Sequence, residues 1–151
     1  MTVLLGVDLG ERRIGLALAG RDGGMAVPLE TLRRGATLTH DVEALLRIVA
    51  SHHVTEIVIG LPLDASGAEG PQAALTRTWA EAIRPHLGLP LAFRDERLTS
   101  HVAEQRLGPM KRGRSGGPPT KTQRDAYRAR VDREAAAIIL QDELDARADR
   151  A

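Results

Sequence analysis

Asp8 is an acidic residue inside an otherwise apolar segment, Val3 to Leu9, near the start of the 151-residue chain. The segment is apolar on both alternating faces, which is typical of a central strand that is covered on both sides. A buried carboxylate is costly unless a hydrogen-bond donor, a bound proton or a metal ion offsets its charge. Two interpretations follow: a metal-binding or catalytic carboxylate, or an aspartate that accepts hydrogen bonds from backbone amides of the turn at Gly10.

Asp132 is a second acidic residue in an apolar setting, here within a predicted helix. The residues three, four and seven positions further on are Ala135, Ala136 and Ile139. A helix therefore places Asp132 on the stripe that faces the core. The alternative is that Asp132 caps a helix that begins there. Thr122 and Asp125 form an earlier cap pair, which favours a helix that carries Asp132 in its interior.

Glu96 lies near the end of the segment Leu91 to Arg97, which the pattern predicts to be a strand. Strand alternation puts Asp95 and Glu96 on opposite faces, so only one of them points into a given site. Charged strand ends are most often solvated surface. Ligand sites in open sheets nevertheless gather at the carboxyl ends of parallel strands, and this position favours Glu96 as a partner of Asp8.

The segment from Gly60 to Pro71 follows a short apolar strand and leads into a predicted helix. Amides before a helix N-terminus can face an anion, so this is a candidate phosphate-facing loop. The residues expected to face the phosphate are Ser66, Gly67 and Gly70. The segment is not a P-loop, because the Lys-Ser/Thr pair of that motif is missing. An ordinary flexible connector is the alternative.

Charge is unevenly distributed along the chain. The formal net charge is only +1, but the segment 106–130 carries +7 and the remainder carries −6. The basic residues of the segment are Arg106, Lys111, Arg112, Arg114, Lys121, Arg124, Arg128 and Arg130. A run of this kind is most often a solvated face. Its position just before Asp132 favours a surface that holds a nucleic-acid backbone, and we expect the first seven of these residues to bind nucleic acid.

Composition excludes several classes of function. The chain has no cysteine, which rules out disulfides, a zinc ribbon and thiol catalysis, and suits a reducing, cytoplasmic setting. None of the five histidines has the spacing of a zinc-protease pair. With one Phe, one Trp and one Tyr, a base-stacking platform of several rings is excluded. No apolar stretch approaches the roughly 18 residues of a membrane span, and no secretion signal begins the chain.

The hydrophobic pattern predicts which elements position these residues. Three strands come first, at 3–9, 14–19 and 25–32, and Pro28 places the third at an edge of the sheet. Helices then alternate with strands. The remaining elements are expected to be a helix that Thr39 caps, a strand at 56–61, a helix from Pro71, a strand at 91–97, a helix at 99–107 and a helix from about 122 to 147.

Three apolar residues of the helix that begins at Pro71 recur at near-fourfold spacing and are expected to face the core: Leu75, Trp79 and Ile83. Gly108 to Thr120 is rich in Gly, Pro and basic residues, which predicts a mobile loop. Strands that are joined through helices run parallel, whereas the first three form an antiparallel meander. The fold class is therefore α/β, a mixed sheet covered by helices.

Four motifs in this order closely resemble the YqgF/RuvX family of the RNase H-like superfamily. They are Gly6–Gly10 with Arg12–Ala17, Ile59–Leu63 with Gly67–Gln72, Asp95–Thr99, and Val131–Asp132 with Ala135–Leu140. The resemblance covers nearly the whole chain. It implies one RNase H-like domain over residues 1–151, with five strands, helices on both faces and a mobile basic loop at 108–121.

The resemblance also implies a hydrolase, a nuclease that depends on Mg²⁺ or Mn²⁺. Carried over by motif, Asp8, Glu96 and Asp132 would be the catalytic, metal-binding carboxylates. The related RuvC resolvases have two further acids, at places that hold Pro62–Leu63 and Ala135 here. Family members are described as nucleases that mature the 5′ end of pre-16S rRNA in ribosome biogenesis, and as Holliday junction resolvases. The implied partner is nucleic acid, with an RNA precursor favoured over branched DNA. The resemblance further implies a cytoplasmic protein, monomeric or homodimeric, that does not bind a membrane.

Two other classes of function remain open at this point. The segment Asp8-Leu9-Gly10 before a second strand is similar to the phosphate-binding hairpin of actin- and hexokinase-type proteins. Those proteins need two such domains, and this chain has length for one. The other alternative is a non-catalytic RNA- or ribosome-associated protein of the same superfamily, against which the three acids argue.

Overall fold

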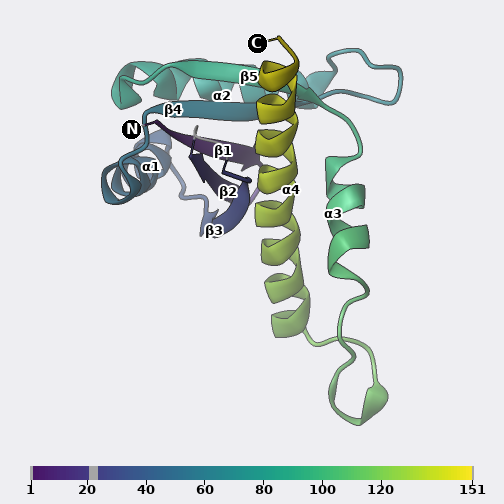
Figure 1. Cartoon of the computed structure of the whole chain (residues 1–151). Coiled ribbons are helices and arrows are strands. Elements are labelled where there is room, and N and C mark those ends of the chain that lie inside the picture. The colour runs from purple at the N-terminus through teal and green to yellow at the C-terminus, as the bar shows by residue number, and fades with distance from the viewer. Residues whose placement is uncertain (1, 21–23, 151) are drawn as a thin grey trace.

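Five strands form one mixed sheet in the order β3-β2-β1-β4-β5 in the computed structural model, which describes residues 2–20 and 24–150 (Figure 1). The strands are β1 (Val3–Leu9), β2 (Arg13–Gly20), β3 (Val27–Arg33), β4 (Glu56–Pro62) and β5 (Leu91–Glu96). The helices are α1 (Leu38–His52), α2 (Pro71–Leu87), α3 (Thr99–Leu107) and α4 (Lys121–Arg150), with a 3₁₀ turn at Arg114–Gly116. This is the predicted order, and β3 is an edge strand as Pro28 indicated.

The pairing of the strands brings two of the acidic residues to one edge of the sheet. β1 pairs antiparallel with β2, with Asp8 opposite Gly15. On its other side β1 runs parallel to β4, which runs parallel to β5 with Pro62 opposite Glu96. Asp8 and Glu96 therefore lie at the carboxyl ends of parallel strands, on either side of β4. This is the edge at which ligands bind in open α/β sheets.

Helices cover both faces of the sheet. On one face, α1 and α2 pack against Leu5 and Val7 of β1. On the other face, α4 packs against Leu4, which precedes Leu5 and therefore points to the opposite side of the strand. Asp8 has the same parity as Leu4, so its side chain points to the α4 face. The alternation of β1 thus decides which helix Asp8 meets.

Glycines allow α4 to lie unusually close to the sheet. A Cβ atom on Gly15 would lie 2.0 Å from the carbonyl oxygen of Asp132, and one on Gly6 would lie 2.8 Å from that of Ala136. Real Cβ atoms do not approach backbone oxygens so closely, so only glycine fits at these two places. The close approach sets Asp132 of α4 directly over the hairpin of β1 and β2.

The structure corrects three of the predicted local details. Thr37, rather than Thr39, caps α1 by accepting a hydrogen bond from the amide of His40 at 3.3 Å. Thr39 lies inside the helix. Leu75 is 62% exposed, whereas Trp79 and Ile83 are buried as predicted. The buried stripe of α2 begins with Ala73 and Thr76, so Leu75 lies one position off the face that covers the sheet.

α4 begins before the cap pair that the sequence suggested. The amide of Gln123 donates to Thr120 Oγ1 at 3.1 Å, and the amide of Thr120 donates to Gln123 Oε1 at 2.8 Å. This reciprocal capping box replaces the predicted pair of Thr122 and Asp125. Asp132 is therefore inside the helix and does not cap it. Neither α4, with 30 residues, nor another helix in the described part of the chain is apolar enough to cross a membrane.

α3 and the first half of α4 form an arm that extends beyond the sheet, with the loop 108–120 at its tip (Figure 1). Ala103 of α3 is fully buried against Val131 and Ala135 of α4. Several hydrogen bonds tie the loop to α4. Tyr127 Oη donates to the carbonyl of Gly108 at 2.8 Å, and Gln123 Nε2 donates to that of Arg112 at 3.0 Å.

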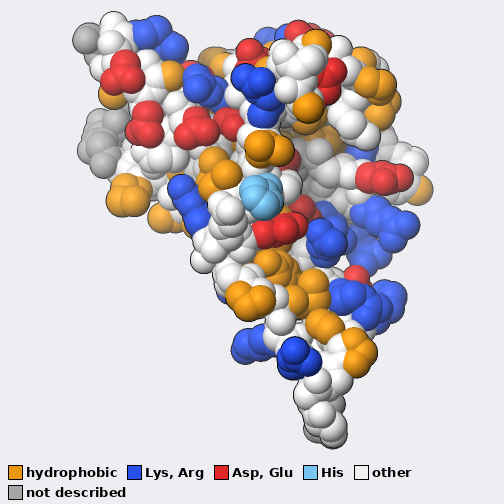
Figure 2. Space-filling model, turned by 90° about the vertical axis from the view of Figure 1, so that its right-hand side faces the viewer, with side chains coloured by type: hydrophobic (Ala, Val, Ile, Leu, Met, Phe, Trp, Pro, Cys, Tyr) orange, Lys and Arg blue, Asp and Glu red, His pale blue; other side chains and the backbone are white. Residues whose placement is uncertain are grey.

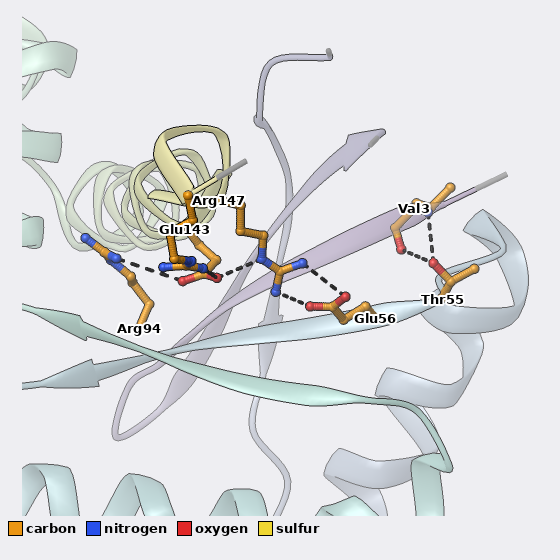
Figure 3. Close-up of polar contacts among 7 residues, drawn as sticks. Val3, Thr55, Glu56, Arg94, Glu143 and Arg147 are labelled. Atoms are coloured by element: carbon orange, nitrogen blue, oxygen red, sulfur yellow. Dashed lines mark hydrogen bonds and ion pairs between the residues drawn. The ribbon is translucent and has the colours of Figure 1, made fainter. Parts of the chain in front are cut away.

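The opposite end of α4 is held by an ion-pair network (Figure 3). Glu143 is 7% exposed and accepts a hydrogen bond from Arg147 Nε at 2.7 Å. Arg147 also binds Glu56 at the start of β4, and Arg94 Nη1 of β5 lies 3.9 Å from Glu143. Removing one partner of a buried pair is costly because the other charge is left uncompensated. The network therefore fixes α4 along the sheet, and with it the position of Asp132.

Candidate active site

Asp8 and Glu96 line the same cavity, which has a volume of about 300 Å³. Asp8 comes from the end of β1 and Glu96 from the end of β5, as the sheet register requires. The residues around the two carboxylates are mostly apolar or small: Gly60, Pro62, Leu63, Leu98, Thr99, Ser100, His101 and Ile139. The structure thus brings together two of the three predicted carboxylates.

Asp8 has an electrostatic environment that opposes its ionisation. Burial raises the pKa of Asp8 from 3.8 to about 7, and the charge of Asp132 adds to the effect. The amide of Gly10, which could have donated to this carboxylate, instead donates to the carbonyl of Arg13 at 2.8 Å. Asp8 is therefore a carboxylate that a bound cation would stabilise.

Glu96 is held from one side and left open on the other. Thr99 Oγ1 donates to Glu96 Oε2 at 2.8 Å. Glu96 Oε1 is buried and has no hydrogen-bond partner among the described residues, and Arg94 Nε is 4.0 Å away. Burial raises the pKa of Glu96 to about 7, although the hydrogen bond from Thr99 acts to lower it. Repulsion from Asp142 of α4 adds to the rise. The sequence reasoning missed Thr99 and Asp142, although Thr99 belongs to the Asp95–Thr99 motif.

Asp132 lies beside this cavity and faces a neighbouring hollow. Its Oδ2 atom accepts a hydrogen bond from Arg13 Nε at 2.6 Å, and its side chain is 19% exposed. Among the described residues, no three Asp, Glu or His side chains are grouped closely enough to hold a metal ion. The third predicted carboxylate is thus near enough to Asp8 to affect its pKa, but an arginine engages it.

The donor set of Asp8 and Glu96 fits a hard divalent cation. Mg²⁺ prefers oxygen ligands, and protein sites often hold it by one or two carboxylates while substrate phosphates and water complete the coordination. Glu96 Oε1 is a buried oxygen without a partner, and the pKa of each carboxyl is raised to about 7 by burial. A cation at this place would satisfy the free oxygen and favour the ionised form of both groups.

Arginines converge on the hollow that Asp132 faces, which has a volume of about 480 Å³. Arg124 and Arg128 line it from α4, Arg12 lines it from the turn between β1 and β2, and Arg13 lines it from the start of β2. Arg12 and Arg13 were not among the predicted nucleic-acid contacts. Their position in the sequence could have indicated this role, because they follow Asp8 by four and five residues and so must lie near the same end of β1.

The other predicted basic residues are placed elsewhere on the arm. Lys111 lines a hollow on a different side of α4, together with Tyr127 and Arg130. Arg106 pairs with Glu134 at 3.4 Å, and Lys121 pairs with Asp125 at 2.9 Å. Arg112 Nη1 donates to the carbonyl of Gly116 at 3.1 Å, and the side chain of Arg114 lies outside the described part of the structure. Figure 2 shows Lys and Arg side chains along this arm.

The candidate phosphate-facing loop carries its own anion. Asp64 Oδ1 accepts hydrogen bonds from the amide of Ser66 at 2.9 Å and from that of Ala68 at 3.1 Å. The amide of Gly67 donates to the carbonyl of Asp64 at 2.9 Å. Gly70 is the N-cap of α2 and supplies no side-chain hydrogen bond to it. A phosphate at Ser66, Gly67 and Gly70 stays a prediction, and it would compete with Asp64.

Comparisons with known proteins agree with this architecture. The profile of the family described as "RuvX: Holliday junction resolvase" matches residues 2–146. A Chloroflexus aurantiacus protein named "Putative pre-16S rRNA nuclease" is 39% identical over 96% of this chain and 88% of its own length. A protein of the same name from an Anaeromyxobacter species is 43% identical over 95% of this chain and 97% of its own.

Among solved structures, Thermus thermophilus RuvC in complex with a Holliday junction substrate superposes with a TM-score of 0.54. That pair is 15% identical over 97% of this chain and 96% of RuvC, so the likeness concerns the fold. With sequence identity near 40% to full-length relatives and a family profile over residues 2–146, the chain belongs to the RuvX (YqgF) family of nucleases with the RNase H-like fold.

Proposed function

We propose that the chain is a divalent-metal-dependent nuclease that hydrolyses phosphodiester bonds at the 5′ end of pre-16S rRNA. The observation that carries the proposal is that Asp8 and Glu96, two carboxyl groups whose pKa burial raises to about 7, line one cavity beside an arginine-lined hollow. Full-length relatives that are about 40% identical bear the name of a pre-16S rRNA nuclease, which supports the choice of substrate. The proposal treats the whole chain as one cytoplasmic nuclease domain.

In this proposal each residue near the cavity has a defined task. Asp8 and Glu96 would hold Mg²⁺ or Mn²⁺, which when bound polarises the phosphoryl oxygen and lowers the pKa of water. Thr99 orients Glu96 through the hydrogen bond to Oε2. Asp132 would assist from the neighbouring hollow once a cation competes with Arg13 for its carboxylate. The predicted basic residues bind phosphates of the substrate and confer affinity without sequence preference.

A second candidate substrate is a Holliday junction, and the description of the family profile favours it. The two substrates share the same chemistry, since both are cut at a phosphodiester bond. They differ in shape and in sugar, because a junction is branched duplex DNA whereas precursor rRNA is a single RNA chain. A direct comparison of cleavage therefore separates them.

The test is a cleavage panel with the wild-type protein, Asp8→Asn and Asp95→Asn, each with Mg²⁺, Mn²⁺ or EDTA. Asp95 is an exposed carboxylate next to Glu96 in sequence and is the matched control. The substrates are precursor 16S rRNA, single-stranded RNA and a four-way DNA junction. We expect metal-dependent cleavage by wild type and Asp95→Asn, none by Asp8→Asn, and similar substrate binding by all three in fluorescence anisotropy. Cleavage by Asp8→Asn at the wild-type rate would show that the site assignment is wrong.

A further inference from the structure

Leu98 has a backbone conformation that leucine rarely adopts. It lies between the end of β5 and the start of α3, with φ 57° and ψ 19° in the left-handed region. In that region the Cβ atom of an L-residue crowds the following carbonyl, so glycine, asparagine and aspartate are the usual occupants. Strained residues of this kind persist where the surrounding structure holds them, and they cluster at functional sites.

Leu98 also does little for the fold through its side chain. The residue is 76% exposed, so its hydrocarbon is not part of the described core. It occupies the N-cap of α3, a position at which Ser, Thr, Asp or Asn would accept a hydrogen bond, and α3 has no side-chain cap. Asparagine would suit these dihedral angles better than leucine does. A single exposed leucine needs no explanation, but this one departs from local preference in three ways at once.

The position of Leu98 at the candidate active site suggests a role for its side chain in binding substrate. It lines the cavity of Asp8 and Glu96, together with the half-buried residues Pro62 and Leu63 at the end of β4. A phosphodiester is charged and polar, so this apolar lining does not match the reacting group. It matches the sugar and base that are attached on either side of it, since ligand sites pair apolar walls with a few polar groups.

We propose that Leu98, Pro62 and Leu63 form a nucleoside subsite, which holds the base and ribose of the nucleotide next to the bond that is cut. The proposal rests on the proposed function, because it takes the carboxylates of the same cavity as the cleavage site. Leu98 is the specificity-determining residue of the subsite. Its exposed side chain covers one face of the base. The short connection that carries it is held in place by β5 on one side and α3 on the other.

The subsite has a consequence for the choice of substrate. Inside a duplex, both faces of a base are covered by its neighbours, so Leu98 cannot reach one without unstacking it. An unpaired nucleotide presents a free face without that cost. We therefore infer that the enzyme cuts unpaired segments and strand ends in preference to the interior of a duplex.

Substitutions of Leu98 separate this role from a structural one. We expect Leu98→Asn to lower kcat/KM on single-stranded RNA by about tenfold, the loss of one well-buried apolar contact, while its melting temperature stays equal to or above that of wild type. Leu98→Met keeps an apolar side chain and should retain cleavage within about twofold. The control is Leu75→Asn, another exposed leucine that lies on α2 and is not part of this cavity's lining. Cleavage by Leu98→Asn at the wild-type rate would overturn the subsite.

A binding measurement tests the same proposal without cleavage. Oligonucleotides that carry 2-aminopurine next to the cleavage position are titrated with Asp8→Asn and with Asp8→Asn/Leu98→Asn. We expect fluorescence to change on binding as the base leaves its neighbours, and the change to be lost in the double variant although anisotropy still reports binding. Equal fluorescence changes with both variants would contradict the subsite. Cleavage by Asp8→Asn would instead overturn the proposed function, so the two failures are distinguishable.

Discussion

Arg13 Nε lies 2.6 Å from Asp132 Oδ2, and this ion pair joins the start of β2 to the middle of α4 directly beside Asp8. The charge of Asp132 adds to the raised pKa of Asp8, so the two acids repel one another. Arg13 offsets part of that repulsion. The pair therefore holds Asp132 next to the cavity while keeping its carboxylate engaged in the absence of a cation.

Removing Arg13 should make the protein depend more on a divalent cation. Without metal, Arg13→Gln is expected to lower the free energy of unfolding by about 1 kcal/mol, because the pair is only partly buried. Mn²⁺ should then raise the melting temperature of the variant by more than that of wild type, since the freed carboxylate of Asp132 can contact the ion. Melting in EDTA and in Mn²⁺ measures both effects. Arg84→Gln, which removes an exposed pair with Glu81, is the control and should show neither.

The raised pKa of Asp8 predicts a dependence of stability on pH. An acid with a higher pKa in the folded state binds more protons when folded, so stability falls as pH rises from 3.8 towards about 7. Asp8→Asn removes this loss, and we expect the metal-free variant to exceed wild type by about 2 kcal/mol at pH 8 but to match it near pH 4. Urea unfolding in EDTA across this range is the measurement. Asp95→Asn should follow the wild-type curve, and a wild-type stability that does not fall relative to Asp8→Asn would contradict the prediction.

The close approach of α4 to β2 predicts that Gly15 cannot be enlarged. A Cβ atom there would lie 2.0 Å from the carbonyl oxygen of Asp132, so Gly15→Ala must push α4 and its carboxylate away from the sheet. We expect a loss of about 3 kcal/mol in the free energy of unfolding and a strong fall in cleavage. Gly20→Ala is the control, because no atom of the residues that the structure describes lies within 4 Å of the added atom. Equal stability of the two variants would show that the helix has room to move.

The arginines around the hollow beside Asp132 should contribute to binding through charge. Substituting Arg12, Arg124 or Arg128 by alanine is expected to weaken binding of unrelated sequences alike and to reduce the slope of log affinity against log salt by about 1 each. Anisotropy titrations at several salt concentrations measure the slope. Arg47→Ala, on α1 at the opposite face of the sheet, should leave it unchanged. An unchanged slope for Arg124→Ala would exclude that residue from the contact surface.

The element order could be predicted because hydrophobic periodicity is a local property of the chain. Strand alternation indicated that only one of Asp95 and Glu96 enters the site, and the structure leaves Asp95 exposed while Glu96 lines the cavity. Helix ends were less accurate: Thr37 caps α1 where Thr39 was expected, and Thr120 with Gln123 caps α4. Several Ser and Thr residues near a helix start can all supply the capping oxygen, and the backbone angles select one.

The sequence by itself determined that Asp8 and Asp132 interrupt apolar segments, that Glu96 ends a predicted strand and that a basic segment precedes Asp132, because residue type and spacing are local properties of the chain. Only the tertiary structure decided that Asp8 and Glu96 share a cavity while Arg13 holds Asp132, and that Leu98 stands exposed beside them. Arg13 and Asp132 are 119 positions apart. Such long-range contacts and backbone angles depend on sheet register and helix packing across the whole fold, so a local sequence pattern does not predict them.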